Sequence, residues 1–458
     1  MSNTTVAEEL NHKGAEFYLQ GNLEAAKFHF TAALMVDYNN PRGLHNLSAS
    51  LLGEGKLWAA LAVARRGVMA APGSAAVRCN LGAAYSRIGK FDLAKRELQA
   101  GIDIDPGLHG LYHNLGLAHY MDGEFSLAVE NYDKALVGSP TAVGLQCDRA
   151  LGILATGDFL RGIAEYECRW DQLVKPKVWD SGIPRWHGED IEGKYIILHH
   201  EQGFGDSIML VRFAEDLLNR GAKVTIAVPP PLIGLFTFNF RRCDVVSWED
   251  APKVPADYWT PMLSAPLHLG ISKEKISSEP YLQAPPWSEA PELPQGFRIG
   301  IVWESGDHGA KLMERRRVAP LELFFPMAEI PNTRIISLQL GGGPQILNTG
   351  AESFIFDAMR RVETFAHTAA IIKSLDLVIA VDSSVAHLAG AMGVPCVVLS
   401  PFTRCWRWWD EDSGDPWYSR MWISSQHEFG NWGIAVTRAT EYASHRARHK
   451  EITMVGTR

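Results

Sequence analysis

The sequence is poor in cysteine, contains no long apolar run and has no excess of basic residues. Its 6 cysteines are scattered through 458 residues, without a CxxC pair or a histidine at metal-ligand spacing, so we expect no metal site. No apolar run reaches the length of a membrane span. Residues 1–10 are polar and acidic, whereas a signal peptide needs a basic stretch followed by an apolar one. We therefore expect a cytoplasmic protein without a membrane span.

Net charge and composition further restrict the class of protein to which the chain can belong. The formal net charge of -8 argues against a nucleic-acid partner, because binding nucleic acid requires a basic face that displaces counterions from phosphates. With 46% apolar and 21% charged residues, the composition is typical of globular proteins. The chain is longer than one hydrophobic core supports, which predicts two or three domains.

A repeat with a period of 34 residues dominates the first third of the chain. Glycine recurs at this spacing at Gly21, Gly55, Gly89, Gly123 and Gly157. A leucine or phenylalanine follows each glycine two positions later, and an alanine or glycine follows five positions later. Three of the units end in a proline, at Pro72, Pro106 and Pro140. Glycine suits a turn between two helices, and the small residue lets those helices approach closely.

This unit resembles the tetratricopeptide repeat (TPR). The resemblance covers roughly residues 6–170, with about four full units and a fifth whose pattern fades at Arg169 and Trp170. One such unit cannot bury its apolar face alone, so the units stack into a superhelix with a concave groove. The expected fold of residues 1–170 is therefore an N-terminal TPR α-solenoid.

A polar residue also recurs every 34 residues, at a position where helix packing requires none. The column is His12, Asn46, Asn80, Asn114 and Asp148. In one interpretation these side chains cap or cross-link neighbouring first helices. In the other, Asn46, Asn80 and Asn114 bind an acceptor. The Asn-Leu pairs resemble those of the nucleocytoplasmic O-GlcNAc transferase family, which implies that the amides hold the backbone of an extended protein substrate.

The pattern changes after a Trp- and Pro-rich stretch at 171–192, which we interpret as a linker packed against the last repeat. Short apolar segments then alternate with helical ones, which is typical of βαβ units. The expected strands are 195–200, 223–228, 297–303, 334–339, 377–381 and 396–399. The proline-rich segment 284–295 separates two groups of strands, so we expect an α + α/β chain with two Rossmann-like lobes, 193–290 and 291–458. Ligands of such sheets bind at the carboxyl ends of the strands.

The first loop at such an end is 201–206. Its glycines allow close approach of the backbone to a ligand and place Asp206 at the start of a helix. Taken alone, Asp206 is explained as a helix N-cap. The segment is neither a dinucleotide fingerprint nor a phosphate-binding Walker loop, because the glycine spacing differs.

The second loop follows the strand at 297–303 and carries Trp303, Ser305 and Gly306, followed by Asp307 and His308. It leads to three arginines that end at Arg317. Small residues and arginines suit a diphosphate, although three arginines also occur as an ordinary solvated charge run.

The third loop, Asp382-Ser383-Ser384, opens a helix that carries His387 one turn later. Backbone N–H groups and two hydroxyls meet at this helix N-terminus, where the helix dipole favours negative charge. The loop therefore predicts an anion site.

The first and third loops together resemble the heptosyltransferase family of GT-B glycosyltransferases, over roughly residues 193–430. The resemblance implies that Asp206 is the general base, with Gln202 and Gly203 beside it on the acceptor side. It also implies that the Asp382-Ser383 pair, with the second loop, Arg317, Ser384 and His387, holds a nucleotide-sugar donor. Val318 and Cys405 depart from the family pattern. The acidic run at 410–412 is interpreted as surface, since GT-B enzymes usually act without a metal.

The combined expectation is a glycosyltransferase with an O-GlcNAc-transferase-like layout and no cofactor other than its nucleotide-sugar co-substrate. The transfer is expected to invert the configuration at the anomeric carbon of the sugar. The acceptor or partner is expected to be a protein held by the repeat groove. Two alternatives stay open. The enzyme could act on a glycan such as lipopolysaccharide, with the repeats docking a partner, or the chain could be a non-catalytic scaffold with a degenerate transferase half.

Overall fold

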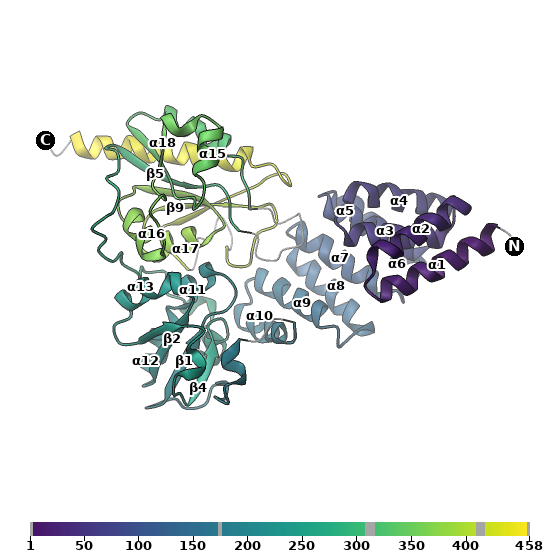
Figure 1. Cartoon of the computed structure of the whole chain (residues 1–458), viewed down its shortest axis with the longest axis horizontal. Helices are drawn as coiled ribbons and strands as arrows, with labels where there is room; N and C mark the ends of the chain where they lie inside the picture. The colour runs from purple at the N-terminus through teal and green to yellow at the C-terminus, as the bar shows by residue number, and fades with distance from the viewer. Residues whose placement is uncertain (1–2, 173–175, 307–316, 409–416, 456–458) are drawn as a thin grey trace. The chain divides into compact units, whose positions relative to one another are not determined.

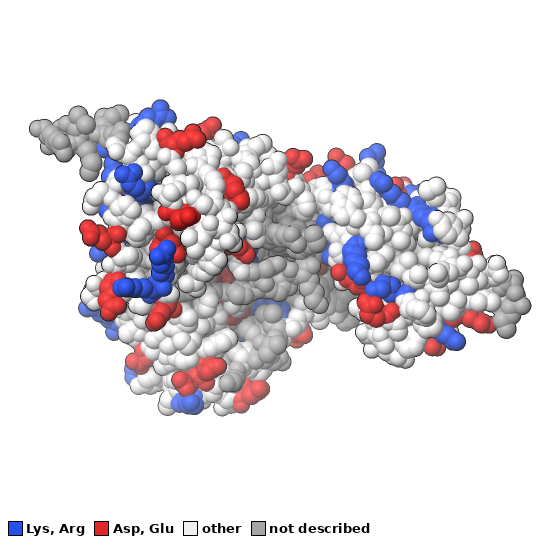
Figure 2. Space-filling model, turned by 45° about the horizontal axis from the view of Figure 1, so that its top comes forward, with Lys and Arg blue, Asp and Glu red and all other residues white. Residues whose placement is uncertain are grey.

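A computed structural model describes residues 3–172, 176–306, 317–408 and 417–455 (Figure 1). These residues form two compact units. The first ends at Thr156 and the second begins at Gly157. On the described part of the face in Figure 2, basic and acidic side chains are interspersed on both units.

The first unit is built from helices that pack against their neighbours along the chain. In order they are α1 (Asn3–Leu19), α2 (Leu23–Val36), α3 (Pro41–Gly53), α4 (Leu57–Ala70), α5 (Ala75–Arg87), α6 (Phe91–Ile104), α7 (His109–Met121), α8 (Phe125–Gly138) and α9 (Val143–Ala155). The helices recur with the 34-residue period of the sequence, so the predicted N-terminal solenoid is confirmed.

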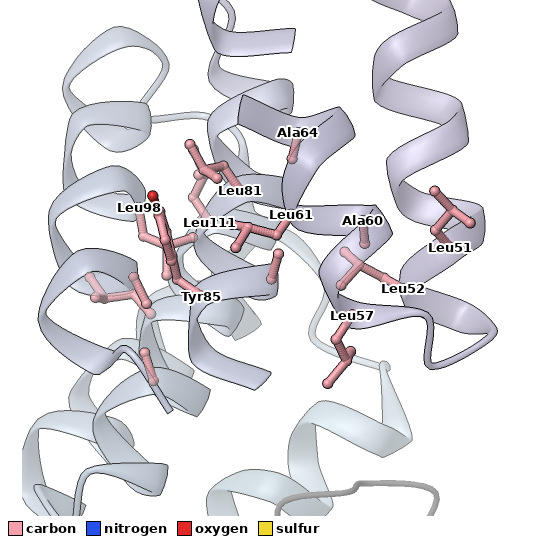
Figure 3. Close-up of a cluster of buried hydrophobic side chains, with 14 of the residues drawn as sticks. Leu51, Leu52, Leu57, Ala60, Leu61, Ala64, Leu81, Tyr85, Leu98 and Leu111 are labelled. Atoms are coloured by element: carbon pink, nitrogen blue, oxygen red, sulfur yellow. The ribbon is translucent and has the colours of Figure 1, made fainter. Parts of the chain in front are cut away.

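The periodic glycines and alanines have the backbone conformation and the burial that the repeat pattern predicts. The five turn glycines have φ between 73° (Gly55) and 91° (Gly157), a region that residues with a Cβ rarely adopt. The alanines at the close-packed positions are fully buried, at Ala26, Ala60, Ala94 and Ala128. Leucines and a tyrosine from α3 to α7 fill the space between the helices, and Figure 3 shows Leu61, Leu81, Tyr85, Leu98 and Leu111 gathered there. Leu98 and Leu111 have no exposed surface, so this core holds consecutive repeats together.

The second unit contains two parallel sheets. The four-stranded sheet has the order β3-β2-β1-β4, and the six-stranded sheet has the order β10-β9-β8-β5-β6-β7. Neighbouring strands in both sheets pair in parallel. The strands are β1 (Tyr195–His199), β2 (Lys223–Val228), β3 (Asp244–Ser247), β4 (Tyr258–Pro261), β5 (Phe297–Val302), β6 (Thr333–Ser337), β7 (Ile355–Asp357), β8 (Leu377–Val381), β9 (Cys396–Ser400) and β10 (Met421–Ser425). The expected parallel-sheet region is thus confirmed, with β3, β4, β7 and β10 added to the predicted strands.

α-Helices connect several of these strands, and one follows the last strand. They are α11 (Phe204–Leu210), α12 (Phe213–Asn219), α13 (Pro230–Asn239), α14 (Ala265–Leu269), α15 (Gly343–Asn348), α16 (Phe365–Ile372), α17 (Ser384–Ala391) and α18 (Gly433–Val455). The helical pattern expected at 207–219 is divided between α11 and α12, which separate at Val211. Arg212 lies between the two helices. Its guanidinium donates hydrogen bonds to the carbonyl oxygens of Ser277 at 2.6 Å and of Trp417 at 3.0 Å.

The second unit begins inside the fifth repeat. Its first helix, α10 (Phe159–Tyr166), is followed by a 3-10 turn, Glu167–Asp171, that carries Arg169. Arg169 is 2% exposed, and its guanidinium donates to both carboxylate oxygens of Glu201, at 2.9 and 3.1 Å. It also donates to Glu167 Oε1 at 2.7 Å. Because a buried charge needs partners of this kind, the network ties the end of the repeat pattern to the four-stranded sheet.

The stretch at 171–192 also joins this sheet. Trp186 N donates to the Trp259 carbonyl oxygen at 2.8 Å, and Trp259 N donates to the Pro184 carbonyl oxygen at 3.0 Å. The Trp170 and Trp179 rings, with centroids 5.5 Å apart, pack against Trp259. The segment therefore continues the edge of the sheet at β4.

Candidate functional site

The carboxyl ends of β1 and β8 come together in the second unit, because α11 and α17 pack against each other. The contact is very close at Gly205. A Cβ built there lies 2.7 Å from His387 Cδ2 and 3.4 Å from Ser384 Cα. Glycine is required at this position because any side chain displaces a buried histidine. The first and third predicted loops thus form one site, although they are far apart in the sequence.

Asp206 is the third residue of α11, and its carboxylate has two partners. Oδ2 accepts from the backbone N–H of Gly203 at 3.0 Å, which is half of a capping box, so Asp206 caps the helix from N3. Oδ1 accepts from Nε of Arg407 at 2.7 Å and also from its Nη2. The carboxylate is 13% exposed and therefore remains accessible while it is ion-paired.

Arg407 was not predicted from the sequence, where it lies 201 residues from Asp206. Burial disfavours its charge, but Asp206, Cys405 and Asp382 together outweigh this effect and raise the pKa of Arg407 well above its usual range. Nη2 also donates to Gln202 Oε1 at 3.0 Å, and Nη1 contacts Cys405 Sγ at 3.0 Å. Cys405 is therefore a direct neighbour of the guanidinium.

The backbone conformation of the first loop, 201–206, supports the Arg407–Asp206 ion pair. Gln202 has φ 63°, in the left-handed region that a non-glycine residue rarely adopts. The next residue, Gly203, is the N-cap of α11 and has an extended backbone. The strained Gln202 thus turns the chain so that its side chain and the Gly203 N–H both face the Arg407–Asp206 pair.

The start of α17 is polar and largely enclosed. Asp382 is 6% exposed, and Arg317 Nη1 lies 3.3 Å from its Oδ2 and donates to its carbonyl oxygen at 3.1 Å. Ser383, the N-cap of α17, is 7% exposed. Within the described residues its hydroxyl has no hydrogen-bond partner and does not cap the helix. An unsatisfied buried hydroxyl beside free helix N–H groups is suited to an anionic ligand.

His387 lies deeper and supports the two loops. It is 3% exposed, its ring stacks on Trp408 with centroids 4.5 Å apart, and Nδ1 lies 3.0 Å from the Tyr418 hydroxyl. Burial lowers the pKa of His387 to about 4, against the opposing effect of Asp382 and Asp206. The imidazole is therefore neutral at neutral pH, and it supports the site by packing.

A second buried histidine fixes the first helix. His200 Nδ1 is hydrogen-bonded to Ser207 Oγ in α11, and its ring packs edge-on against Trp248 with centroids 5.3 Å apart. Burial lowers the pKa of His200 to about 4. Sequence reasoning did not single out this pair, because neither residue belongs to a recognisable motif.

The second loop is described as far as Gly306 and again from Arg317. Ser305 N donates to the Arg317 carbonyl oxygen at 3.0 Å, and Ala319 N donates to the Trp303 carbonyl oxygen at 2.8 Å. Glu304 and Val318 form an antiparallel bridge between these hydrogen bonds. The two described ends of the loop are thus paired, and this pairing sets the position of Arg317. The predicted residues Asp307, His308, Arg315 and Arg316, and the acidic run 410–412, lie outside the described residues.

Trp303 occupies a supporting position. Its side chain has no exposed surface, and its indole N–H donates to Gln345 in α15. The ring also packs against Gly342, where a built Cβ lies 2.7 Å from it. The Trp303 side chain is therefore part of the core beside α15 and supports the paired ends of the loop.

A cavity of about 750 Å³ lies on the carboxyl edge of the six-stranded sheet, beside the ends of β6 and β7. It is lined by Gly343 and Pro344 at the start of α15 and by Asp357, Ala358 and Arg360 after β7. Asp357 Oδ2 lies 3.4 Å from Arg360 Nε. The volume falls in the range of small-molecule sites. The sequence did not reveal this cavity, because β7 is a three-residue strand without a clear pattern.

The asparagine column of the first unit links neighbouring repeats. Asn80 Nδ2 donates to the His45 carbonyl oxygen and to Ser48 Oγ, both at 2.9 Å. Asn114 Nδ2 lies 3.1 Å from Cys79 Sγ. For Asn46 the described residues give no hydrogen bond to the side-chain amide, and Asn46 is half-buried. The column thus includes cross-links between first helices as well as one amide that is open to another partner.

Comparison with known proteins identifies the repeated unit. Residues 75–108 match the tetratricopeptide repeat. The first unit is therefore a TPR array, an architecture whose stacked helices form extended surfaces for binding other proteins.

A longer similarity extends beyond the repeats. Over 318 residues the chain is 26% identical to the protein FlbA of Caulobacter vibrioides, which covers 62% of this chain and 52% of FlbA. The chain thus spans about half the length of this curated relative.

Solved structures are similar to smaller parts of the chain. A thermophilic TPR protein from Thermus thermophilus is 23% identical, with a TM-score of 0.33, over 38% of this chain and 94% of that one. PilF of Pseudomonas aeruginosa is 15% identical, with a TM-score of 0.35, over 48% of this chain and 89% of that one. These similarities carry no argument about function. Within the described ranges, none of the helices combines the length and the apolar character that a membrane span requires.

Proposed function

We propose that the chain is an inverting glycosyltransferase that moves a sugar from a nucleotide-sugar donor to a protein acceptor. The observation that carries the proposal is the meeting of Asp206 with the polar start of α17 at the carboxyl ends of two parallel sheets. A carboxylate on one side and an anion site on the other are the two groups that sugar transfer requires.

The sheet topology supports the proposal of two Rossmann-like lobes in a GT-B arrangement, 193–290 and 291–458. The order β3-β2-β1-β4 matches one half of a doubly wound sheet plus the first strand of the other half. In the six-stranded sheet β5 lies between β8 and β6, so the strand order reverses there. Ligands of such sheets bind at this switch point, where the second and third loops emerge.

The donor is assigned to the second lobe. Ser383 Oγ, the N–H groups that begin α17, and the Arg317 guanidinium supply hydrogen bonds and positive charge for a diphosphate. The cavity beside β6 and β7, on the same edge of the sheet, has room for the nucleoside.

The transfer then needs one proton acceptor. Asp206 takes the proton from the acceptor hydroxyl as its oxygen attacks the anomeric carbon, and the bond from that carbon to the diphosphate breaks. The negative charge that grows on the diphosphate is stabilised by the α17 N-terminus and Arg317. The neutral His387, in the first turn of α17, packs against Gly205 and Trp408 and contacts the Tyr418 hydroxyl, and so holds the two loops together.

The TPR array is the proposed acceptor site. Asn46 is the best placed member of the column, since its amide is not engaged by a neighbouring repeat within the described residues, whereas Asn80 is. Asn46→Ala should therefore weaken transfer to protein without destabilising the array. Asn80→Ala should also lower the free energy of unfolding, by about 1–3 kcal/mol. Equal loss of stability in both variants would contradict this assignment.

The donor assignment is tested by a thermal-shift screen of nucleotide sugars against the wild type and Ser383→Ala. A ligand that binds only the folded state raises the melting temperature. Because the Ser383 hydroxyl makes no hydrogen bond within the described residues, its removal should leave the melting temperature without ligand nearly unchanged. The shift caused by the donor should shrink. An equal shift in both proteins would remove Ser383 from the donor site.

A further inference from the structure

The Arg407 guanidinium lies beside Asp206, the proposed base. Two of its three nitrogens donate to Asp206 Oδ1, and one of these also donates to Gln202. The third nitrogen, Nη1, contacts the Cys405 sulfur. Sulfur is a weak acceptor, so among the described residues part of the donor capacity of this guanidinium is poorly used.

The pairing with Arg407 restricts the access of an acceptor hydroxyl to Asp206. Oδ1 accepts from two nitrogens of Arg407, which uses both of its lone pairs, and Oδ2 accepts from the Gly203 N–H. A hydrogen bond from the acceptor hydroxyl to Oδ1 must therefore replace a contact with Arg407. The Gly203 contact belongs to the helix cap, which leaves Arg407 as the partner that can be exchanged.

Arg407 is also within electrostatic reach of the proposed donor site. The carboxylate of Asp382, at the start of α17, contributes to the raised pKa of Arg407. A diphosphate bound at α17 carries more negative charge than Asp206 and offers several oxygens to the guanidinium fork. The side chain of Arg407 is 16% exposed, so it is not locked in a closed core.

We infer that Arg407 is a positioning residue that exchanges partners, from Asp206 in the free protein to the diphosphate of the bound donor. This inference rests on the proposed function. Without donor, Arg407 holds Asp206 in an unproductive ion pair. With donor, the same guanidinium binds the leaving group and frees the carboxylate to accept a proton, so donor binding prepares the base.

The exchange has a measurable consequence, because Asp206 and the diphosphate compete for one guanidinium. Asp206→Asn removes the charged competitor, so it should tighten binding of a nucleoside diphosphate by about tenfold. Arg407→Ala should weaken binding. The double variant should bind the nucleoside diphosphate no more tightly than Arg407→Ala alone, since no guanidinium is left to be released.

The test is calorimetric titration of the full-length chain with UDP, GDP and ADP, in the wild type, both single variants and the double variant. Asp244→Asn and Arg420→Ala are matched controls, since both residues are exposed and lie outside the site. Arg407→Lys, which keeps the charge but lacks the fork, replaces Arg407→Ala if the latter is poorly folded.

The outcomes distinguish failure of the partner exchange from failure of the proposed function. Tightening by Asp206→Asn that requires Arg407 supports the exchange. Tightening of the same size in the Arg407→Ala background reflects direct charge repulsion and overturns the exchange, while the proposed function stands. If no nucleoside diphosphate binds to the wild type, the proposed function fails and the exchange fails with it.

Discussion

Arg169→Met should destabilise the second unit more than any surface substitution near it. Arg169 is 2% exposed and donates to Glu201 at 2.9 and 3.1 Å and to Glu167 at 2.7 Å. Within the described part of the chain, its removal leaves Glu201, whose side chain is 4% exposed, without a cationic partner. Breaking a buried ion pair in this way costs about 3–5 kcal/mol. For a unit of this size, the corresponding fall in melting temperature is about 5–8 °C.

The assay is thermal unfolding of the full-length chain followed by tryptophan fluorescence. Of its 14 tryptophans, only Trp58 precedes Gly157, so the signal reports almost entirely on the second unit. Arg161→Met is the matched control, because the Arg161–Glu165 pair lies on the adjacent helix α10 and Arg161 is 53% exposed. That variant should cost less than about 0.5 kcal/mol. Equal, small effects of the two substitutions would refute the claim that the Arg169 network anchors the end of the repeats to the sheet.

Three other predictions follow from buried groups. His387 has a pKa of about 4 when folded and 6.5 when unfolded, so the unfolded state binds more protons between these values. Stability should therefore fall as pH drops from 6.5 to 4, and His387→Gln should reduce this slope in urea titrations by up to about 1.4 kcal/mol per pH unit. An unchanged slope would mean that His387 is not buried as a neutral group. Gly205→Ala should cost about 1–3 kcal/mol by displacing His387, and a crystal structure with the histidine unmoved would contradict this. Leu98→Ala should destabilise the TPR array by about 2–5 kcal/mol, measured by circular dichroism, whereas exposed Met69→Ala should not.

The repeat array was predictable because its signal is local and repeated. Each turn glycine and each buried alanine is required by the same helix contact, so one column of the sequence reveals the whole unit. The end of the first unit was not predictable in the same way. The glycine pattern continues to Gly157, but Arg169 and its partners attach α10 to the sheet, and that contact depends on Glu201, 32 residues later.

The site was predictable only in part, for a related reason. Asp206 and Ser383 lie in loops that directly follow apolar strands, where ligand-binding residues of parallel sheets gather. Arg407 is a single arginine between two tryptophans, and nothing near it in the sequence links it to Asp206. Trp303 also lies after a strand, but its ring turns into the core, since side-chain direction after a strand depends on packing that the sequence pattern does not specify.

The most direct test of the glycosyltransferase proposal is release of nucleoside diphosphate from a panel of nucleotide sugars. The purified full-length chain is incubated with each sugar, with and without a protein acceptor, and Asp206→Asn is compared with the control Asp244→Asn. We predict acceptor-dependent release by the wild type and Asp244→Asn, and loss of that release in Asp206→Asn. Undiminished release by Asp206→Asn, or no release from any nucleotide sugar by the wild type, would contradict the proposed function.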